Sequence, residues 1–411
     1  MSFPVIARGL GRSYGDSSLQ PHQTIDMTAF DHMLSFDESS GLLEVEAGVT
    51  LKEVLETFVP RGWFPPVTPG TQYVTIGGMI ATDVHGKNHH VAGSFGQHLV
   101  SIDVLVNGGT IITCNKETNA DLFHATIGGM GLTGIILRAS FHLIRVTSAY
   151  IHKETMVTSN LDETMNQFEA SATWPYTVAW IDCLATGQDL GRSIFYRGEH
   201  AKIESLSANL RSTPLKVGKK SKLSIPVNFP QFVLNRWSVK MFNAFYYWRG
   251  RKSSGAGIVD YDSFFYPLDS IIGWNRMYGR KGFLQYQCVF PKVSSREGLI
   301  KVLNLVAEAG TGSFLTVLKL FGKQAGVLSF PMEGYTLAMD FPLSEKNLQL
   351  LESLDKLVAE YGGRLYLAKD ARMPARFFKE TYANVGLFNA ARSTYRTSDK
   401  FTSLQSERLG L

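Results

Sequence analysis

Residues 69–96 read PGTQYVTIGGMIATDVHGKNHHVAGSFG, a segment in which glycine, threonine, serine and alanine crowd the positions between apolar residues. Small side chains let the backbone lie against a large flat ligand, and glycine permits the closest approach. We therefore expect this segment to form one wall of a ligand site.

Two further stretches are rich in glycine. Residues 8–16 read RGLGRSYGD, with two arginines and Ser13 beside three glycines. Backbone N–H groups of such a loop can approach a pyrophosphate while the arginines supply charge, although a tight surface turn with stray arginines has the same pattern. Residues 128–135, GGMGLTGI, again offer backbone rather than side chains.

Four of the ten histidines fall between His85 and His98. Imidazole is a common metal ligand, so a metal site made of His85, His89 and His90 is one interpretation. We favour a place for His85 beside an organic cofactor and expect no metal, because the cluster lacks partner cysteines and a helical frame.

The composition of the 411-residue chain is that of a globular protein with two or more domains, being 44% hydrophobic and 19% charged with a net charge of +5. This mild charge does not indicate nucleic acid binding. Three distant cysteines argue against a disulfide framework or a cysteine metal site. We expect neither a transmembrane segment nor a signal peptide, because long apolar runs are missing and Arg8 and Arg12 interrupt the N-terminus.

Up to about residue 146, short β-like runs alternate with glycine-rich turns. Thr50 and Glu53 predict a capping box at the start of an amphipathic helix, Asn107-Gly108 predicts a hairpin turn, and residues 134–146 predict a long strand. This pattern differs from the regular strand-helix alternation of a Rossmann fold.

From about residue 151 helix-forming stretches increase, and the later part predicts a split β-α-β pair, which is a ferredoxin-like sheet. The predicted strands are 283–290, 314–321, 335–341 and 364–368, and the predicted helices are 295–309 and 345–361. Gly362-Gly363 is expected to end the second helix.

Residues 216–252 combine basic and aromatic side chains, with eight aromatics between Phe229 and Trp248. We favour a segment of the domain core with solvated flanks. The alternative is a lid, or a face that touches a membrane surface or an amphiphilic substrate. Single-stranded nucleic acid uses similar residues and is the least favoured partner, so we expect no nucleic acid.

Taken together, these strings resemble the FAD-binding domain of the vanillyl-alcohol oxidase and para-cresol methylhydroxylase superfamily. Within it they are similar to the flavin subunits that act on polyprenylphosphoryl ribose, and the likeness continues through GFLQYQ, SFLTVLKLFG, LSFP and GGRLYLAKDAR. The resemblance implies an α+β protein: an FAD-binding domain over residues 1–147, a substrate domain with a ferredoxin-like antiparallel sheet over 148–363, and a segment 364–411 that returns to the first domain. Because the family has a strand and a helix before the RGLGRSYGD loop and only residues 1–7 precede it here, we expect an N-terminally shortened FAD domain.

The resemblance also assigns site residues. It implies non-covalent FAD held by Gly9, Gly11, Arg12, Ser13, Tyr14, Gly70, Thr71, Thr75, Gly77, Gly78, Ala81, His85, Gly86, Asn88, His89, Ile135 and Tyr366. Lys369 is the candidate base or alkoxide stabiliser, with Tyr14 and His85 as the next catalytic candidates. An ordinary lysine is a poor base at neutral pH, so this role requires burial or a cationic neighbour.

Gln285, Gln287 and Lys319 alternate with apolar residues on predicted strands, which suits a polar-lined substrate pocket, although any of them could simply be solvated. Lys369 is the fourth candidate for substrate binding. Two positions depart from relatives: Ala338 stands where some carry a cysteine, so we expect no thiol chemistry there, and Thr336 replaces an amide.

By resemblance, the expected reaction is oxidation of the 2′-hydroxyl of a polyprenylphosphoryl-β-D-ribose to the keto sugar. A partner keto-reductase that uses NAD(P)H would then complete epimerisation to the arabinose donor of a cell-wall polysaccharide. The alternative is an aldonolactone or alditol oxidase that passes electrons to oxygen, and a flavin-free binding protein is a third reading. The expected location is the cytoplasm or the envelope, peripheral at the inner membrane.

Overall fold

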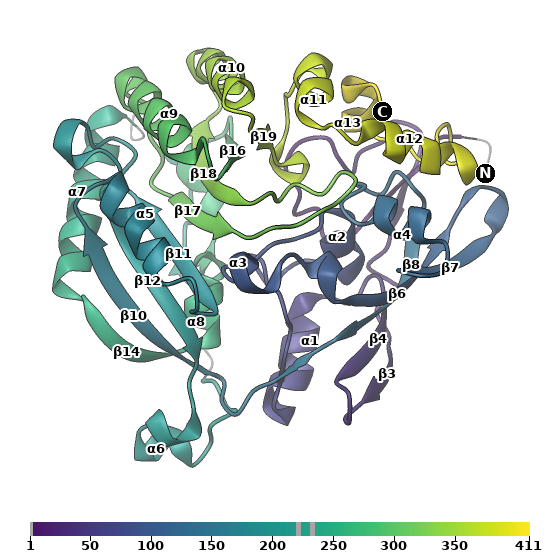
Figure 1. Cartoon of the computed structure of the whole chain (residues 1–411), viewed down its shortest axis with the longest axis horizontal. Helices are drawn as coiled ribbons and strands as arrows, with labels where there is room; N and C mark the ends of the chain where they lie inside the picture. Colours follow the sequence, from purple (N-terminus) through teal and green to yellow (C-terminus); the bar gives the residue numbers. More distant parts are fainter. Residues whose placement is uncertain (1–2, 219–222, 231–234) are drawn as a thin grey trace.

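The computed structural model describes residues 3–218, 223–230 and 235–411 and contains two β-sheet units (Figure 1). The N-terminal unit holds a five-stranded antiparallel sheet in the order β3-β4-β8-β6-β7. Its strands are β3 (Met33–Asp37), β4 (Leu42–Glu46), β6 (Leu99–Leu105), β7 (Ile111–Asn115) and β8 (Ile135–His142). Leu43 and Val45, two residues apart on β4, are buried in the core of this unit, as one covered sheet face requires.

The structure tests three local predictions for this unit. The capping box is confirmed, because the Thr50 side chain accepts from the Glu53 backbone and the Glu53 carboxylate accepts from the Thr50 backbone at the start of α1 (Leu51–Phe58). The hairpin is confirmed, since β6 and β7 pair antiparallel around the turn Asn107–Gly109. The strand 134–146 is interrupted, because the Leu143 N–H donates to the Gly41 carbonyl between β8 and β9 (Ile144–Arg145), and β9 pairs with β5 (Trp63–Phe64).

The second sheet has eight strands in the order β14-β10-β12-β11-β17-β18-β16-β19. The strands are β10 (Tyr150–Thr158), β11 (Tyr176–Ile181), β12 (Ser193–His200), β14 (Gly255–Asp260), β16 (Phe283–Pro291), β17 (Thr316–Phe321), β18 (Gly334–Pro342) and β19 (Arg364–Leu365). The predicted ferredoxin-like unit is confirmed in β16 to β19, together with its helices α9 (Ser295–Ala309) and α10 (Glu345–Glu360).

The sheet is a doubled version of that unit. Strands β10, β11, β12 and β14 repeat the fourth-first-third-second order of β16 to β19, and α5 (Leu161–Ala170) and α7 (Arg236–Lys252) occupy the chain positions of α9 and α10. The halves join where β11 pairs with β17 through Ala179–Leu318 and Trp180–Val317.

The two faces of this sheet differ. Side chains at 286, 288, 337 and 339 join helices α9 and α10 in a large apolar core. The alternate positions at 285, 287, 336 and 338 face the other way and line a cavity. Because successive strand residues point to opposite faces, the helix-covered face holds the domain together and the open face is left for the site.

Of the C-terminal helices, α12 (Val385–Thr394) and α13 (Leu404–Leu409) lie beside the N-terminal unit, and α11 (Ala375–Thr381) lies between α10 and α13 (Figure 1). There α12 packs on α4 (Ala120–Thr126), and Val5 pairs with Phe401. Close by, β1 (Ile6–Arg8) pairs with β2 (Thr24–Asp26).

The predicted strand 364–368 is wrong in its second half. Strand β19 ends at Leu365, and residues Leu367–Lys369 form a 3₁₀ turn in which the Lys369 N–H donates to the Tyr366 carbonyl. Among the helices in the described ranges, none is both long enough and apolar enough to cross a bilayer.

Candidate active site

A cavity of about 1260 Å³ is lined by both units. The N-terminal unit contributes the loop at 8–14, parts of 68–87 and residues from 130–136. The second sheet contributes residues 178–180 of β11 and alternate residues of β16, β17 and β18, and the turn at 366–369 adds to the wall. The volume exceeds the roughly 300–1,000 Å³ of an ordinary small-molecule pocket, so the cavity has room for more than one ligand.

The glycine-rich loop lies close to other backbone. A Cβ at Gly9 would collide with the Thr75 side chain, and a Cβ at Gly15 would collide with the backbone of Asp370 and Ala371. Gly15 also has a φ of +67°, which favours glycine. The loop is thereby fixed against the start of α2 (Ile76–Ala81), where Thr75 caps the Gly78 N–H, and against the turn that carries Lys369.

This end of the cavity fits the FAD implied by the resemblance. Three glycine-rich segments provide backbone, Arg8 and Arg12 supply positive charge, and both arginines line the cavity. His85 adds a buried ring nitrogen, Nδ1, that has no hydrogen-bond partner in the described chain. Buried polar atoms are ordinarily paired, so this nitrogen is available to a ligand.

Lys369 lies at the junction of the two units. Its Nζ is 4.3 Å from the centroid of the Tyr14 ring, and the Tyr14 N–H donates to the Ala368 carbonyl at 2.8 Å. Burial, opposed by the Asp340 carboxylate and assisted by the Lys319 charge, lowers the pKa of Lys369 to about 8. The structure thus supplies the burial and the cationic neighbour that a lysine base requires.

Asp340 is the buried acid that acts on Lys369. Burial raises its pKa to about 6. Its carboxylate accepts hydrogen bonds from Gln285 Nε2 at 2.6 Å and from the Tyr278 hydroxyl at 3.2 Å. Asp340 follows Thr336 and Ala338 at alternate positions of β18, and it faces Gln285 across the pair of strands.

His85 contacts the substrate-side strands. Gln287 Nε2 donates to His85 Nε2 at 2.9 Å and lies 3.2 Å from the Thr336 hydroxyl. Burial, with Lys319, His89 and Lys369 nearby, lowers the pKa of His85 well below its ordinary value. The imidazole is therefore neutral at pH 7, and its ring proton sits on Nδ1 because Nε2 accepts.

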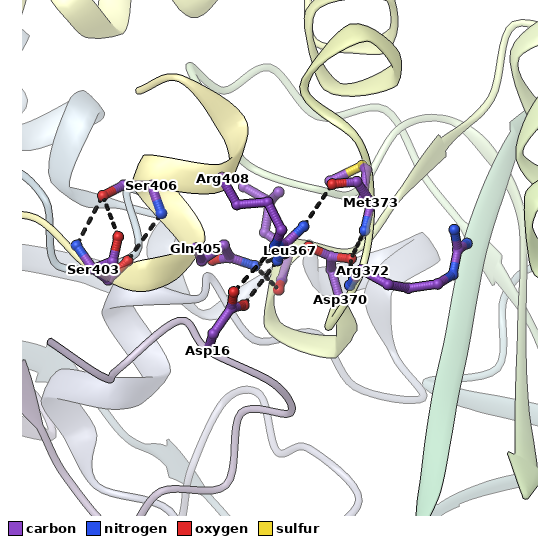
Figure 2. Close-up of polar contacts among 9 residues, drawn as sticks. All are labelled: Asp16, Leu367, Asp370, Arg372, Met373, Ser403, Gln405, Ser406 and Arg408. Atoms are coloured by element: carbon purple, nitrogen blue, oxygen red, sulfur yellow. Dashed lines mark hydrogen bonds and ion pairs between the residues drawn. The ribbon is translucent and has the colours of Figure 1, made fainter. Parts of the chain in front are cut away.

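The C-terminal helix holds the glycine-rich loop and the lysine turn together. Figure 2 shows Arg408 of α13 between Asp16 and Asp370, with its Nη2 2.8 Å from an oxygen of each. Arg408 Nε also donates to Asp16, and Gln405 donates to the Leu367 carbonyl. Asp16 ends the loop and Asp370 follows Lys369, so α13 links both sides of the cavity.

The cavity brings together most of the residues selected from the sequence. Those in its wall are Gly9, Gly11, Arg12, Ser13, Tyr14, Gly70, Thr71, Thr75, Gly77, Gly78, Ala81, His85, Gln285, Gln287, Lys319, Tyr366 and Lys369. Gly86, Asn88, His89 and Ile135 are not part of it.

Those four have other surroundings. Asn88 donates to the Pro66 carbonyl, and His89 Nε2 is 3.0 Å from the Gln324 side chain. Ile135 is buried in a small core with Val5 and Phe401. His89 and His90 begin the one-turn helix α3 (His89–Ala92), so the expectation that the histidines lack a helical frame is wrong: the Asn88 carbonyl accepts from both Val91 and Ala92.

Sequence reasoning missed several residues of the wall. Lys87 lies in the quoted segment, but its neighbours gave no reason to expect burial. Lys153 and Tyr196 belong to the half of the sheet that the sequence did not predict, whereas Tyr246 lies on α7 within the basic and aromatic segment 216–252 that the sequence did single out. Asp340 could have been predicted from the sequence, because it continues the alternate positions 336 and 338 on one strand.

Comparison with known proteins agrees with this geometry. Residues 1–115 match a sequence family described as FAD binding domain. With the cavity and its glycine-rich wall, this match defines a FAD-dependent oxidoreductase, and FAD is its cofactor. The chain is 38% identical over 414 residues to decaprenylphosphoryl-β-D-ribose oxidase of Mycolicibacterium smegmatis, which covers 99% of this chain and 89% of the relative. The chain belongs to the family of that oxidase, which confirms the resemblance.

Two other relatives show how the similarity is distributed. An uncharacterised protein in the mprA 5′ region of Streptomyces coelicolor is 32% identical over 88% of this chain and 100% of its own length. Cytokinin dehydrogenase 3 of Arabidopsis thaliana is 31% identical, but the match covers 35% of this chain and 28% of that protein. The likeness to the ribose oxidase therefore extends well beyond the part shared with the cytokinin dehydrogenase.

Proposed function

We propose that the protein oxidises the 2′-hydroxyl of a polyprenylphosphoryl-β-D-ribose to the 2′-keto sugar. The observation that carries this proposal is Lys369, a buried amine beside Tyr14 in a cavity that fits FAD, in a chain similar to a ribose oxidase along 99% of its length. Bound FAD supplies the hydride acceptor.

The protein's own groups account for the proton. The neutral form of Lys369 takes the hydroxyl proton as the C2′–H bond is lost, and the resulting ammonium is stabilised by the buried Asp340 carboxylate. Gln285 and Gln287 lie on the same strand face and orient the sugar hydroxyls. Lys319 contacts the charged part of the substrate.

The test is anaerobic mixing of the FAD-loaded protein with a short-chain prenylphosphoryl ribose. Loss of the oxidised flavin absorbance with this substrate, and slower or absent loss with aldonolactones and alditols, is expected. Preferential reduction by a polyol would instead identify the alternative, an oxidase of simple sugar acids or alcohols. A protein that does not retain flavin would contradict both of these functions.

We further propose that the FAD is not covalently attached. His85, the histidine candidate for a covalent link, has its Nε2 hydrogen-bonded to Gln287 and belongs to a segment similar to the non-covalent branch of the superfamily. Acid precipitation is expected to release the yellow colour into the supernatant, whereas a yellow pellet would contradict the proposal.

The keto sugar is the substrate of a second proposed protein, a reductase that uses NAD(P)H and returns a hydride to C2′ from the opposite face. The net result is epimerisation to the arabinose donor. Joint incubation with such a reductase and NADH is expected to convert the ribose lipid into the arabinose lipid, and neither protein alone is expected to do so.

Association with a membrane surface is also proposed. Helix α7 exposes Trp237, Met241, Phe245 and Trp248 by 78%, 72%, 55% and 50%, at helical spacing along one face. The exposed Arg249, Arg251 and Lys252 follow in its last turn. Aromatic and basic side chains on one exposed helix suit the interface of an anionic bilayer.

A further inference from the structure

Apart from Lys369, the arginines and lysines of the cavity fall into two groups. Arg8 and Arg12 belong to the glycine-rich loop, at the end that fits the FAD pyrophosphate. Lys87, Lys153 and Lys319 line the same cavity from the other side, from the loop after α2 and from strands β10 and β17. One pyrophosphate at the glycine-rich loop does not account for the second group.

The second group has few partners of its own. Within the described chain, the ammonium groups of Lys319 and Lys153 make no hydrogen bond or ion pair, and Lys153 Nζ lies 5.4 Å from the centroid of the Tyr196 ring. Lys87 Nζ donates to the Phe264 carbonyl and lies 4.3 Å from the centroid of the Phe264 ring. Among the described residues, no carboxylate forms an ion pair with any of these three lysines.

Lys319 and Lys153 disfavour the charged form of Lys87. Burial, followed by the charges of Lys319 and Lys153, lowers the pKa of Lys87 to about 7. Burial lowers the pKa of Lys319 to about 8. Buried cations are stabilised by pairing, so an anion among these three would offset both their desolvation and their mutual repulsion.

The wall next to this group is aromatic. Tyr246 of α7 lies 4.7 Å from the Trp180 ring centroid, and its hydroxyl is 3.4 Å from that of Tyr196, the residue beneath Lys153. All three aromatics line the cavity. The same helix carries the exposed face of Trp237, Met241, Phe245 and Trp248.

We propose that Lys87, Lys153 and Lys319 form a phosphate-binding subsite that holds the phosphodiester linking the sugar to its lipid. The identity of this phosphate rests on the proposed function. The ligand is then oriented in one direction: the sugar lies toward Lys369, the phosphate between the three lysines, and the prenyl chain along Trp180, Tyr196 and Tyr246 toward the exposed face of α7.

The first experiment compares a charged with an uncharged substrate in FAD-loaded protein. Lys319→Met and Lys153→Met are each expected to raise the KM for farnesylphosphoryl ribose by about 10- to 100-fold, the usual effect of losing a charged hydrogen bond. The KM for a farnesyl riboside without phosphate is expected to stay within about twofold. Lys323→Met, which removes an exposed lysine four residues from Lys319, is the matched control.

Two outcomes would overturn the subsite. Equal increases in KM for the charged and uncharged substrates would make the lysines structural. The comparison uses KM because Lys319 also lowers the pKa of Lys369, so kcat is expected to fall for both substrates in Lys319→Met. Loss of FAD from Lys319→Met would assign the lysines to the cofactor. Lys87→Met is the third variant, with Lys87→Arg as its conservative partner, because Lys87 also contacts Phe264 and its removal can affect folding. Restored KM in Lys87→Arg supports the subsite, and a folded Lys87→Met with unchanged KM contradicts it.

A binding experiment separates this proposal from the proposed reaction. Farnesyl phosphate, which has no sugar, is titrated into the FAD-loaded protein while flavin and tryptophan fluorescence are recorded. Binding that weakens about 10-fold or more in Lys319→Met supports the subsite even if no ribose is ever oxidised. If the protein oxidises the ribose substrate but Lys319→Met binds farnesyl phosphate as tightly as the parent, the proposed reaction is supported and the proposed subsite is overturned. Competition by inorganic phosphate as strong as that by farnesyl phosphate would overturn the assignment to a lipid phosphodiester.

Discussion

Lys369 has the burial and the nearby cation, Lys319, that lower the pKa of a lysine base, while the nearby carboxylate of Asp340 opposes this shift and can stabilise the ammonium that forms. We expect Lys369→Ala to retain FAD and to lose about a hundred- to ten-thousand-fold in the rate of flavin reduction, the usual range for a general acid-base group. Rapid mixing under anaerobic conditions measures this rate. Lys379→Ala removes an exposed lysine ten residues away and is the control. Reduction within about threefold of the parent would exclude Lys369 as the base and turn attention to Tyr14 and His85.

The pH dependence of flavin reduction follows from the same lysine. The neutral amine is the active form, and its fraction rises as the pH increases through about 8, the pKa that burial gives Lys369. The rate is therefore expected to rise about tenfold per pH unit below 8 and to level off above it. A rate that falls over this range would contradict a lysine base.

Asp340 is a positioning residue that affects the pH dependence of flavin reduction through the pKa of Lys369. Its negative charge raises the pKa of Lys369, opposing burial, so Asp340→Asn removes an effect that favours the ammonium form. We expect the midpoint of the pH profile to move to lower pH while FAD content stays the same. A purely structural role would lower the rate at every pH and leave the midpoint in place. An unchanged midpoint would refute the assignment.

At the level of elements, the last helix holds two segments that come from opposite ends of the chain. Arg408 of α13 binds Asp16 and Asp370 (Figure 2). The Arg408 side chain keeps 24% of its surface exposed. Removing one partner of a buried ion pair costs roughly 3–5 kcal/mol. Because of the partial exposure we expect a smaller loss from Arg408→Met, about 2–3 kcal/mol in the free energy of unfolding.

Arg408→Met is also expected to release FAD on gel filtration, because the loop ending at Asp16 is no longer held against the turn at Asp370. Arg408→Lys keeps the charge but loses the planar fork, so an intermediate effect is expected. Denaturant unfolding and the flavin-to-protein absorbance ratio measure the two effects. A destabilised variant that retains its flavin fully would limit α13 to a role in stability.

Elements with a local signal were predictable from the sequence, and those fixed by distant contacts were not. The cap of Thr50 on α1, and helices α9 and α10, have patterns complete within a few residues. The half-sheet of β10 to β14 was missed because the 54 residues between β12 and β14 separate its last strand from the others. The same reason applies to the site. Lys369 was identified by resemblance, whereas the partial burial of Lys87 and Lys153 depends on residues far away in the chain.

At the scale of the whole molecule, the cavity exists only where the two units meet. The glycine-rich loop comes from the first, the polar strand face from the second, and the C-terminal segment joins both. The half of the sheet made of β10, β11, β12 and β14 also carries α7. The helix that supplies Tyr246 to the cavity is therefore the helix that exposes the apolar face to solvent.

Docking of this face on a bilayer is the prediction that concerns the whole molecule, since it places the cavity close to the lipid that would carry the substrate. We expect the triple variant Trp237→Ser, Phe245→Ser, Trp248→Ser to lower the partition onto anionic vesicles at least about tenfold, because each exposed aromatic contributes to interfacial binding. Replacement of Arg249 and Lys252 by glutamine is expected to weaken binding to anionic vesicles and to leave binding to neutral vesicles unchanged, since each basic residue near an anionic surface contributes about 1 kcal/mol.

Vesicle sedimentation at two salt concentrations measures these effects, and higher salt is expected to reduce the contribution of the basic residues. The control is Val293→Ser with Leu387→Ser, which removes exposed apolar side chains from other parts of the surface. Both sets of variants are expected to keep FAD and to oxidise a short-chain, water-soluble prenylphosphoryl ribose at the parent rate, because the altered side chains are not part of the cavity wall. Equal recovery of the parent protein in the supernatant with and without anionic vesicles would refute the docking face. Equal loss of binding in the control would show that exposed apolar area in general, rather than α7, is responsible.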